Sequence, residues 1–372
     1  MLKNINDLYG KKIVLLSAAN NIHTIRWANG LASRGVDLHL ISIHQPITGL
    51  DEKVKVHFIP VKKPFGYFTS VKKVKRLIKK IKPMLVNAHY ATGYGLLAKL
   101  SKCTPLLLSV WGSDVYSFPK KSSLHRLILK MNLSSATAIA STSNIMAKET
   151  KSIYNHKNMF ITPFGIDEFR FTRIPTSHKK EIIIGCVKTL EEVYGIDILI
   201  KSFSMAHNRI SKYNKSLANN LRLIIAGKGS QKSKLIQLTK ELNISHLVEF
   251  TGYINHDKVP MMLNNFDIYV ALSNSESFGV AILEASACEL PVVVSDADGL
   301  VEVTIENKTA LVVPKKDVNK AADALIKLIT DKALREKLGI EGRKHVLENY
   351  SWEASINTML YAYLKTIELA EK

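Results

Sequence analysis

One stretch of the chain joins an apolar run, a polar turn and a helical pattern, and it constrains the fold more than any other feature. The run at residues 268–272 has the length and composition of a strand buried in a parallel sheet. Residues 280–287 continue as a helix. In such a sheet the backbone N–H groups that start the helix, at Phe278, Gly279 and Val280, point out of the carboxyl edge. The stretch therefore predicts a parallel α/β sheet with an anion site suited to a diphosphate.

Two glutamates flank this turn. Glu276 stands in the turn itself, and Glu284 follows about two helical turns later. Carboxylates accept hydrogen bonds from hydroxyl groups, and sugars and riboses offer pairs of hydroxyls. Amides that bind phosphate beside carboxylates that bind hydroxyls are the pattern expected for a nucleotide-sugar site.

The sequence Glu276-Ser-Phe-Gly-x4-Glu284 resembles the paired-glutamate motif of the retaining glycosyltransferases of family 4, and residues 285–295 and 299–302 resemble the segments that follow it there. The resemblance covers nearly the whole chain and is strongest over residues 248–314. It implies the GT-B fold, in which two Rossmann-like domains with parallel sheets face each other across a cleft. It also implies that Glu276 faces the donor sugar, that Glu284 holds the ribose, and that the anomeric configuration is retained.

The length of the chain favours two domains, because 372 residues are many for one. We predict an acceptor-side domain over residues 1–170, a nucleotide-sugar-binding domain over 171–350, and a helix over 351–372 that returns to the first domain. The three cysteines are odd in number and lack metal-ligand spacing, which indicates a reduced, cytoplasmic protein with free thiols. No run of 18 apolar residues occurs, so no transmembrane helix is expected.

The first half of the chain offers two polar candidates for an acceptor site. Its opening strand is followed by Ala-Ala-Asn-Asn instead of Gly-x-Gly-x-x-Gly, which counts against a dehydrogenase. His89 ends a later strand, and Asp114 follows another strand in Trp111-Gly-Ser-Asp. A lone histidine after a strand is more often a structural residue. Because both segments resemble the acceptor side of the family, we predict that His89 and Asp114 act with Glu276 in catalysis.

The second half places further turns at the carboxyl edge that holds the paired glutamates. Lys188 follows one strand, and Lys228 lies in a Gly-Lys-Gly turn after the next. Both cations are predicted to neutralise a bound diphosphate. The family usually has a lysine where this chain has Val193 or Tyr194, depending on the gap, and a glycine where Glu289 stands. A missing cation should slow departure of the diphosphate, so either Lys228 substitutes or activity is impaired.

The positive charge is concentrated in the first half of the chain. Residues 1–170 hold 26 Lys and Arg against 8 Asp and Glu, whereas residues 171–372 hold 26 against 24. From Val71 to Lys82 the apolar residues form one stripe at helical spacing, and all the remaining positions from 72 on are Lys or Arg. We predict a helix that buries the stripe and docks on an anionic membrane surface through its basic face. Three aromatic residues are expected at the same interface: Phe65, Tyr67 and Phe68.

Together these features predict a glycosyltransferase of the hexosyltransferase type, peripheral at the inner face of the cell membrane. It would move a sugar from a nucleotide-sugar donor to a glycan or lipid-linked glycan in surface polysaccharide synthesis. No Asp-x-Asp or other metal-ligand spacing occurs in the turns, so no metal and no other cofactor is expected. One alternative is a GT-B epimerase, which would convert the donor without an acceptor. The other is a basic nucleic-acid-binding protein, but the basic stretch lacks a helix-turn-helix, RRM or zinc motif, and no nucleic acid partner is expected.

Overall fold

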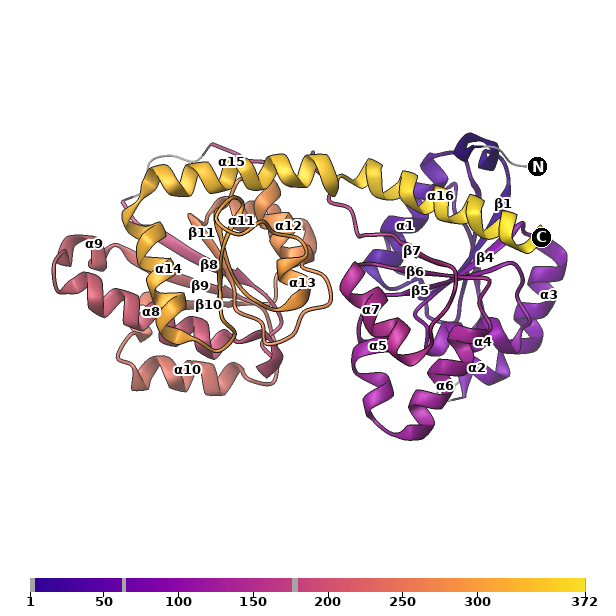
Figure 1. Ribbon diagram of the computed structural model, residues 1–372, viewed down its shortest axis with the longest axis horizontal. Helices are drawn as coiled ribbons and strands as arrows, with labels where there is room; N and C mark the ends of the chain where they lie inside the picture. Colours follow the sequence, from indigo (N-terminus) through magenta and orange to yellow (C-terminus); the bar gives the residue numbers. More distant parts are fainter. Residues whose placement is uncertain (1–3, 62–64, 176–179, 372) are drawn as a thin grey trace. The chain divides into compact units, whose positions relative to one another are not determined.

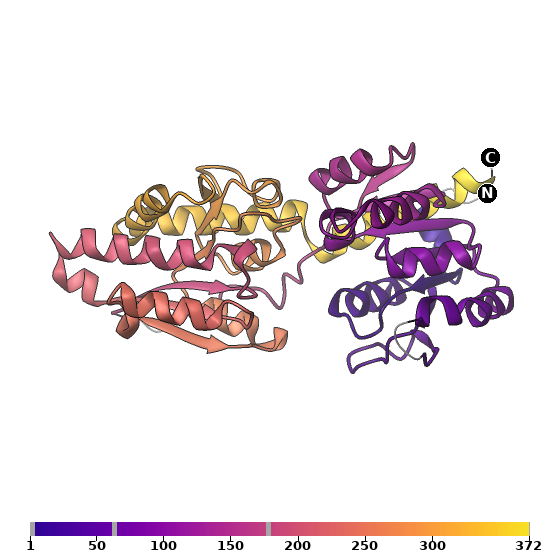
Figure 2. The same ribbon diagram turned by 90° about the horizontal axis from the view of Figure 1, so that it is seen from below.

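The structure is a computed structural model of the chain and describes residues 4–61, 65–175 and 180–371. These residues form two compact units, one from residues 1–164 with 353–372 and the other from residues 165–352. Each unit is an all-parallel sheet with helices packed against it (Figures 1 and 2). The predicted fold class, two Rossmann-like α/β domains, is confirmed.

The first unit contains a seven-stranded sheet in the order β3-β2-β1-β4-β5-β6-β7. The chain order reverses between β1 and β4, and ligands of such sheets bind at the carboxyl ends of the strands on either side of this switch point. The strands are β1 (Lys12–Leu16), β2 (Asp37–Ser42), β3 (Lys55–Phe58), β4 (Leu85–His89), β5 (Leu106–Val110), β6 (Ala138–Ser141) and β7 (Met159–Ile161). The helices are η1 (Ile5–Leu8), α1 (Ile22–Ser33), α2 (Gly66–Thr69), α3 (Val71–Ile81), α4 (Gly93–Leu100), α5 (Ser113–Tyr116), η2 (Phe118–Lys120), α6 (Ser123–Ser134), α7 (Asn144–Ile153) and α16 (Trp352–Glu371).

The central strands of this sheet are apolar because both of their faces are covered. All residues of β4 and β5 are buried, as are residues 13–16 of β1. The helix after β1 begins at Ile22. The reason is a cap: the side-chain oxygen of Asn21 accepts a hydrogen bond from the amide of His23 at 2.8 Å.

Helix α16 packs on the first unit although it comes last in the described chain. Residues along one of its faces are buried, including Ile356, Met359, Tyr363 and Ile367. The hydroxyl of Tyr363 donates a hydrogen bond of 2.9 Å to the side-chain oxygen of Asn87 in β4. The core of the first unit therefore depends on residues from both ends of the sequence (Figure 1).

The basic segment forms a helix as predicted. Helix α3 covers Val71–Ile81, and Lys82 follows it with a left-handed backbone (φ 54°) that ends the helix. Val74 is fully buried, and every Lys and Arg of the helix is exposed. Lys62 and Lys63, which precede the helix in the same basic stretch, lie outside the described residues.

Tyr67, predicted to lie at a membrane interface with Phe65 and Phe68, is partly buried. Its ring packs edge-on against the ring of Tyr94, with 5.6 Å between the centroids. Phe65 and Phe68 are 65% and 58% exposed. The single turn of helix α2 separates these side chains, so that Tyr67 turns toward the sheet edge while the two phenylalanines face solvent.

The second unit contains a six-stranded sheet in the order β10-β9-β8-β11-β12-β13, which reverses between β8 and β11. The strands are β8 (Ile182–Val187), β9 (Leu221–Ala226), β10 (Val248–Gly252), β11 (Ile268–Ala271), β12 (Val292–Ser295) and β13 (Ala310–Val313). The α-helices are α8 (Ile196–Ser211), α9 (Lys215–Asn219), α10 (Lys232–Glu241), α11 (Val259–Asn264), α12 (Val280–Ala287), α13 (Asp298–Val301), α14 (Val318–Thr330) and α15 (Lys332–Asn349). Three short 3-10 helices complete the unit: η3 (Glu192–Tyr194), η4 (Ser245–Leu247) and η5 (His256–Lys258).

The departure from the family at Glu289 has a structural explanation. This residue follows α12 with φ 57°, the left-handed conformation that glycine adopts at least cost. Its carbonyl oxygen lies against Gly339 of α15, where an added Cβ would approach it to 2.1 Å. A glutamate therefore ends α12 here in a conformation that glycine would adopt at lower cost.

Candidate active site

A buried ion pair lies at the switch point of the second sheet. Lys188 follows β8 and Glu276 lies in the turn after β11, and the Lys188 Nζ is 2.6 Å from the Glu276 Oε2. The two side chains are 16% and 10% exposed. The hydroxyl of Ser273 lies 3.4 Å from the same carboxylate oxygen. Two residues 88 positions apart are thus in direct contact at the edge where we predicted both.

The environment of Lys188 favours its charged form. Burial by itself lowers the pKa of Lys188, because it disfavours an ammonium group. The charge and the hydrogen bond of Glu276 outweigh burial, so that the pKa of Lys188 is raised above its ordinary value. The Nζ also lies 4.5 Å from the centroid of the Tyr194 ring. A fixed positive charge therefore stands at the switch point at neutral pH.

The Gly-Lys-Gly turn after β9 packs on the backbone of the Lys188 turn. The Leu190 amide donates a 3.0 Å hydrogen bond to the carbonyl oxygen of Lys228. Gly227 has φ 151°, and an added Cβ would lie 1.8 Å from the Lys188 carbonyl oxygen, so the close approach requires glycine. The Lys228 side chain is exposed, and its Nζ lies 4.7 Å from the centroid of the Tyr253 ring. The turn thus positions Lys188, while the charge of Lys228 stands beside Tyr253.

The start of α12 is held by the neighbouring helix α13. The Gly279 amide donates to the Gly299 carbonyl (3.1 Å), and the Val280 amide donates to the Phe278 carbonyl (2.9 Å). The Gly299 amide donates to the Glu276 carbonyl (3.1 Å), and an added Cβ at Gly299 would lie 2.4 Å from that oxygen. Two of the three amides that we predicted for donor binding therefore have partners within the protein. Sequence reasoning missed the backbone contact of Gly299 that holds this turn.

Glu284 is the fifth residue of α12, just over one turn into the helix, and is 7% exposed. Its Oε1 is 2.9 Å from the Nε2 of His256, the first residue of η5. The backbone carbonyl of His256 in turn accepts a 2.7 Å hydrogen bond from Arg170. No sequence pattern marks His256, a lone histidine in a turn. A carboxylate held through one oxygen keeps its orientation and still accepts hydrogen bonds from hydroxyl groups.

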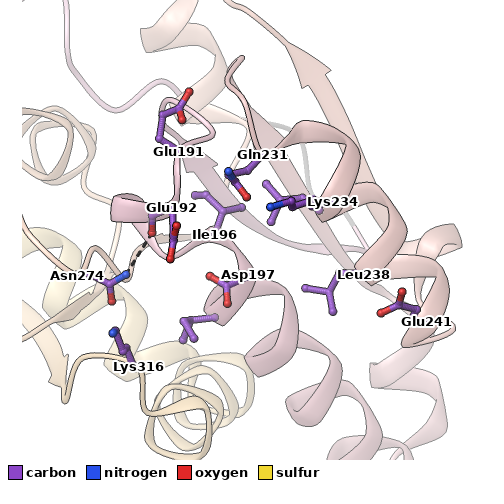
Figure 3. A pocket seen from close by; sticks show the side chains of 12 residues that line it. Glu191, Glu192, Ile196, Asp197, Gln231, Lys234, Leu238, Glu241, Asn274 and Lys316 are labelled. Atoms are coloured by element: carbon purple, nitrogen blue, oxygen red, sulfur yellow. Dashed lines mark hydrogen bonds between the residues drawn. The ribbon is translucent and has the colours of Figure 1, made fainter.

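A pocket of about 550 Å³ lies next to these turns in the second unit (Figure 3). The side-chain Nδ2 of Asn274 donates to the Glu192 carbonyl at 3.2 Å across one side of it. Neither Lys188, Glu276 nor Glu284 lines this pocket, so we assign the candidate active site to the switch point instead. Charged residues of both signs line the pocket: Glu191, Glu192, Asp197, Lys234, Glu241 and Lys316.

His89 ends β4 in the first unit and is 1% exposed. Its Nδ1 lies 3.1 Å from the Ser17 hydroxyl, and its Nε2 lies 3.0 Å from the side-chain oxygen of Asn87. Since the Asn87 amide nitrogen donates to a backbone carbonyl, its oxygen must accept, which assigns the proton to His89 Nε2. Burial lowers the pKa of His89 to about 3, so the ring is neutral at pH 7.

Asp114 lies at the carboxyl end of β5 and is 1% exposed. One carboxylate oxygen accepts from the amide of Ala91 at 2.9 Å, and the other accepts from Gly112 at 2.8 Å and Trp111 at 3.2 Å. Burial raises the pKa of Asp114, and these hydrogen bonds offset only part of the increase. Both His89 and Asp114 thus join neighbouring strand ends near the switch point of the first sheet. Their predicted catalytic roles stay predictions.

Within residues 4–61, 65–175 and 180–371 there is no group of three or more His, Cys, Asp or Glu side chains that could hold a metal ion. The three cysteines are free and buried, and burial raises the thiol pKa of each to about 12. In the same described ranges, no helix combines the length and the apolar content required to cross a bilayer.

Two family models match the chain on either side of the boundary between the units. The model described as "Glycosyl transferases group 1" matches residues 167–345, and the model described as "Glycosyl transferase 4-like" matches residues 12–143. The chain belongs to the group 1, family 4 glycosyltransferases. The family and the enzyme class that the glutamate motif indicated are therefore confirmed.

This glycosyltransferase is similar to proteins of several bacteria. It is 25% identical to the capsular polysaccharide biosynthesis glycosyltransferase CapM of Staphylococcus aureus, over 91% of this chain and 93% of that one. It is 23% identical to N-acetyl-alpha-D-glucosaminyl L-malate synthase of Bacillus anthracis, over 90% and 91%. The crystal structure of Anabaena HepE in complex with UDP-glucose superposes with a TM-score of 0.77 at 17% identity, covering 95% of this chain and 99% of that one. The glycosyltransferase thus has the predicted GT-B fold.

The family's lysine position falls at Val193 or Tyr194 in this glycosyltransferase, and the Val193 side chain is 40% exposed in η3, five residues after Lys188. We expect Val193→Lys to tighten nucleoside diphosphate binding about two- to tenfold, because one more exposed charge near the diphosphate contributes roughly 1 kcal/mol. Isothermal titration with UDP, GDP and ADP measures the effect. Ile340→Lys adds the same charge on an exposed part of α15 and should leave affinity unchanged. Equal affinity in both variants would mean that Lys228 or another cation already fills the role.

Proposed function

We propose that the enzyme is a retaining hexosyltransferase that moves a sugar from a nucleotide-sugar donor to a glycan or lipid-linked glycan, in surface polysaccharide synthesis. The observation that carries this proposal is the Lys188–Glu276 ion pair at the switch point of the second sheet, with Glu284 on the helix that starts beside it. A cation for phosphate and two carboxylates for hydroxyl groups stand there together, as a nucleotide-sugar requires.

The chemistry follows from these groups. As the sugar departs, negative charge develops on the diphosphate, and a cation already fixed in place stabilises that charge without reorganisation. Lys188 is held for this by Glu276 and by the Gly227 turn, and Lys228 stands on the neighbouring turn. Glu276 faces the sugar and Glu284 accepts the ribose hydroxyls. We propose that these fixed cations serve without a metal ion.

The names of similar proteins support this direction. CapM is named for capsular polysaccharide biosynthesis, and the HepE crystal structure contains UDP-glucose. The Bacillus anthracis relative is named as a synthase that joins an N-acetylglucosaminyl group to malate. All three are consistent with a nucleotide-sugar donor.

The test is nucleoside diphosphate release from a panel of UDP-, GDP- and ADP-sugars, with and without glycan acceptors. Release that requires an acceptor, with product of the same anomeric configuration as the donor, is the expected result. Conversion of the donor sugar without any acceptor would indicate the epimerase instead. No turnover of any donor, together with salt-sensitive binding to DNA or RNA, would favour the nucleic-acid-binding alternative.

We also propose that the first unit docks on an anionic membrane through α3, which fits a lipid-linked acceptor at the inner face of the cell membrane. Solvation alone does not require one sign of charge on a helix face, whereas each basic residue near anionic lipid contributes roughly 1 kcal/mol. The exposed rings of Phe65 and Phe68 precede the basic face in sequence. The face consists of Lys72, Lys73, Lys75, Arg76, Lys79, Lys80 and Lys82, all of them exposed.

We expect the enzyme to sediment with anionic liposomes, to bind them less as salt screens the charges, and to bind neutral liposomes weakly. Reversing four lysines of α3 to glutamate should reduce binding to anionic liposomes at least about tenfold, because several contributions of roughly 1 kcal/mol are lost. Equal sedimentation with neutral vesicles, or none with anionic ones, would contradict membrane docking. The reversed residues are Lys72, Lys73, Lys79 and Lys80, and the matched control reverses four exposed lysines of the second unit: Lys232, Lys240, Lys320 and Lys337.

A further inference from the structure

The first unit has a pocket of about 270 Å³ that His89, one of the two residues predicted for the acceptor side, helps to line. It opens where β1, β2, β4 and β5 end, and so lies at the switch point of this sheet, where α/β folds bind ligands. Its volume equals about nine waters at roughly 30 Å³ each, which suits one sugar ring. The residues used in the argument are Tyr67, His89, Tyr90, Thr92, Tyr94 and Trp111.

The pocket carries no permanent charge although the first unit is strongly basic. Among the described residues, no Asp, Glu, Lys or Arg lines it. Two histidines do: His44, whose Nδ1 lies 2.8 Å from the Tyr94 hydroxyl, and His89, which is neutral because burial lowers its pKa to about 3. A phosphate or carboxylate placed here would lose its hydration without gaining a cation, and burial of an unpaired charge is strongly unfavourable. The lining therefore selects for an uncharged ligand.

Aromatic rings form the walls of the pocket. Tyr67 and Tyr94 meet edge to face at 5.6 Å, and Tyr90 and Trp111 meet at 89° with 6.4 Å between their centroids. Such rings offer an apolar face to the C–H groups of a sugar and hydroxyl groups at their edges for its oxygens. A few polar groups on a mostly aromatic lining are typical of a site for a small, neutral, hydroxylated ligand.

The backbone of Tyr90 is strained, which is further evidence for a ligand site at this pocket. Its φ is 75°, a left-handed conformation that is a genuine outlier for a bulky residue. The strain is maintained by surrounding bonds: the Tyr90 hydroxyl bonds to Ser113, the Tyr90 amide donates to the Ser109 carbonyl at 2.9 Å, and Asp114 holds the next amide. Strain of this kind concentrates at ligand sites. Here it directs the Tyr90 ring to the pocket.

From these observations we infer that the pocket binds an uncharged sugar ring of the acceptor. The enzyme would then use a neutral glycan end as its acceptor, and not a small anionic acceptor such as a sugar phosphate or a hydroxy acid. Any phosphate of a lipid-linked acceptor would lie outside the pocket. The inference rests on the proposed glycosyl transfer and adds the chemical class of the acceptor.

The test is direct binding to the full chain, with and without UDP or GDP, by saturation-transfer NMR. Methyl glucoside, methyl galactoside, methyl mannoside and methyl N-acetylglucosaminide are compared with glucose 1-phosphate, glucuronate and malate. At least one neutral glycoside should bind at least about tenfold more tightly than every anion. Trp111→Leu and Tyr67→Leu should each weaken that binding at least about fivefold, whereas Tyr213→Leu, an exposed tyrosine of the second unit, should not.

Anions that bind as tightly as neutral glycosides would overturn the inference, as would binding that survives both pocket variants or the absence of binding by every neutral glycoside. Thermal unfolding identifies a pocket variant that fails to fold. Ligand binding by the other pocket variant then tests the inference. Nucleoside diphosphate binding, measured in parallel, should be unchanged in all three variants. Its absence in the unmodified enzyme would count against the proposed donor chemistry, and not against the pocket.

Discussion

Replacing Glu276 or Glu284 by alanine is expected to lower kcat/KM at least about tenfold. Each carboxylate makes charge-assisted hydrogen bonds worth roughly 1.5–3 kcal/mol, or about ten- to 150-fold in rate or affinity. Loss of Glu276 also leaves Lys188 mostly buried without its partner, so this variant should have the larger effect on kcat. Loss of Glu284 should act mainly on the KM of the donor. Steady-state kinetics with the donor found in the release assay measures both.

The matched controls for this prediction are Glu276→Gln and Glu284→Gln, which keep the shape and remove the charge. Glu276→Gln can still accept a hydrogen bond from Lys188, so its thermal midpoint should remain near that of the unmodified enzyme while turnover falls. Near-normal turnover in either alanine variant would refute the assignment of that glutamate. A loss that tracks unfolding alone, with the glutamine variants fully active, would assign both residues to stability only.

The second large effect is expected from Gly227→Ala. The added Cβ would lie 1.8 Å from the Lys188 carbonyl oxygen, and the residue would have to keep φ 151°. The β9 turn or the Lys188 turn must therefore move, at a cost of at least about 2 kcal/mol. We expect a thermal midpoint lower by roughly 4–8 °C and nucleoside diphosphate affinity at least about tenfold lower. Thermal unfolding and isothermal titration are the two measurements.

Gly252→Ala is the matched control for that variant. Gly252 also has a left-handed backbone (φ 76°), but an added Cβ there would meet nothing within 4 Å. Only the conformational strain of roughly 1–2 kcal/mol should appear, with affinity changed less than about twofold. If both variants lose affinity equally, strain in the sheet and not the contact with Lys188 is responsible. If neither does, the glycine turn plays no part in donor binding.

The elements around the candidate site were predictable where the signal is local. The apolar run and the helical pattern predicted a strand over 268–272 and a helix over 280–287, and β11 and α12 have almost these bounds. Helix α3 was predictable for the same reason. The edge at which Lys188 and Glu276 meet followed from parallel strands alone, because all their carboxyl ends lie on one side.

The contacts that hold the site could not be predicted, because they join distant residues without a repeating pattern. His256 reaches Glu284 from a 3-10 turn 28 residues earlier, and no periodicity marks it. The Gly299 amide, in the short helix α13 that follows β12, donates to the Glu276 carbonyl. Tyr67 is aromatic like its exposed neighbours Phe65 and Phe68. It differs from them only in the direction in which its side chain leaves the single turn of α2.

The position of α16 affects how the enzyme is made. The first unit needs this helix: Tyr363 bonds to Asn87, and the buried face of α16 completes the same core. Yet residues 165–352, the whole second unit, leave the ribosome before it. At roughly 5–20 residues per second, the first unit waits about 10–40 s with an apolar surface uncovered. The units therefore need not fold in the order of their sequence, because the second unit can fold before the first is complete. Until α16 is synthesised, chaperones and proteases have access to the incomplete first unit.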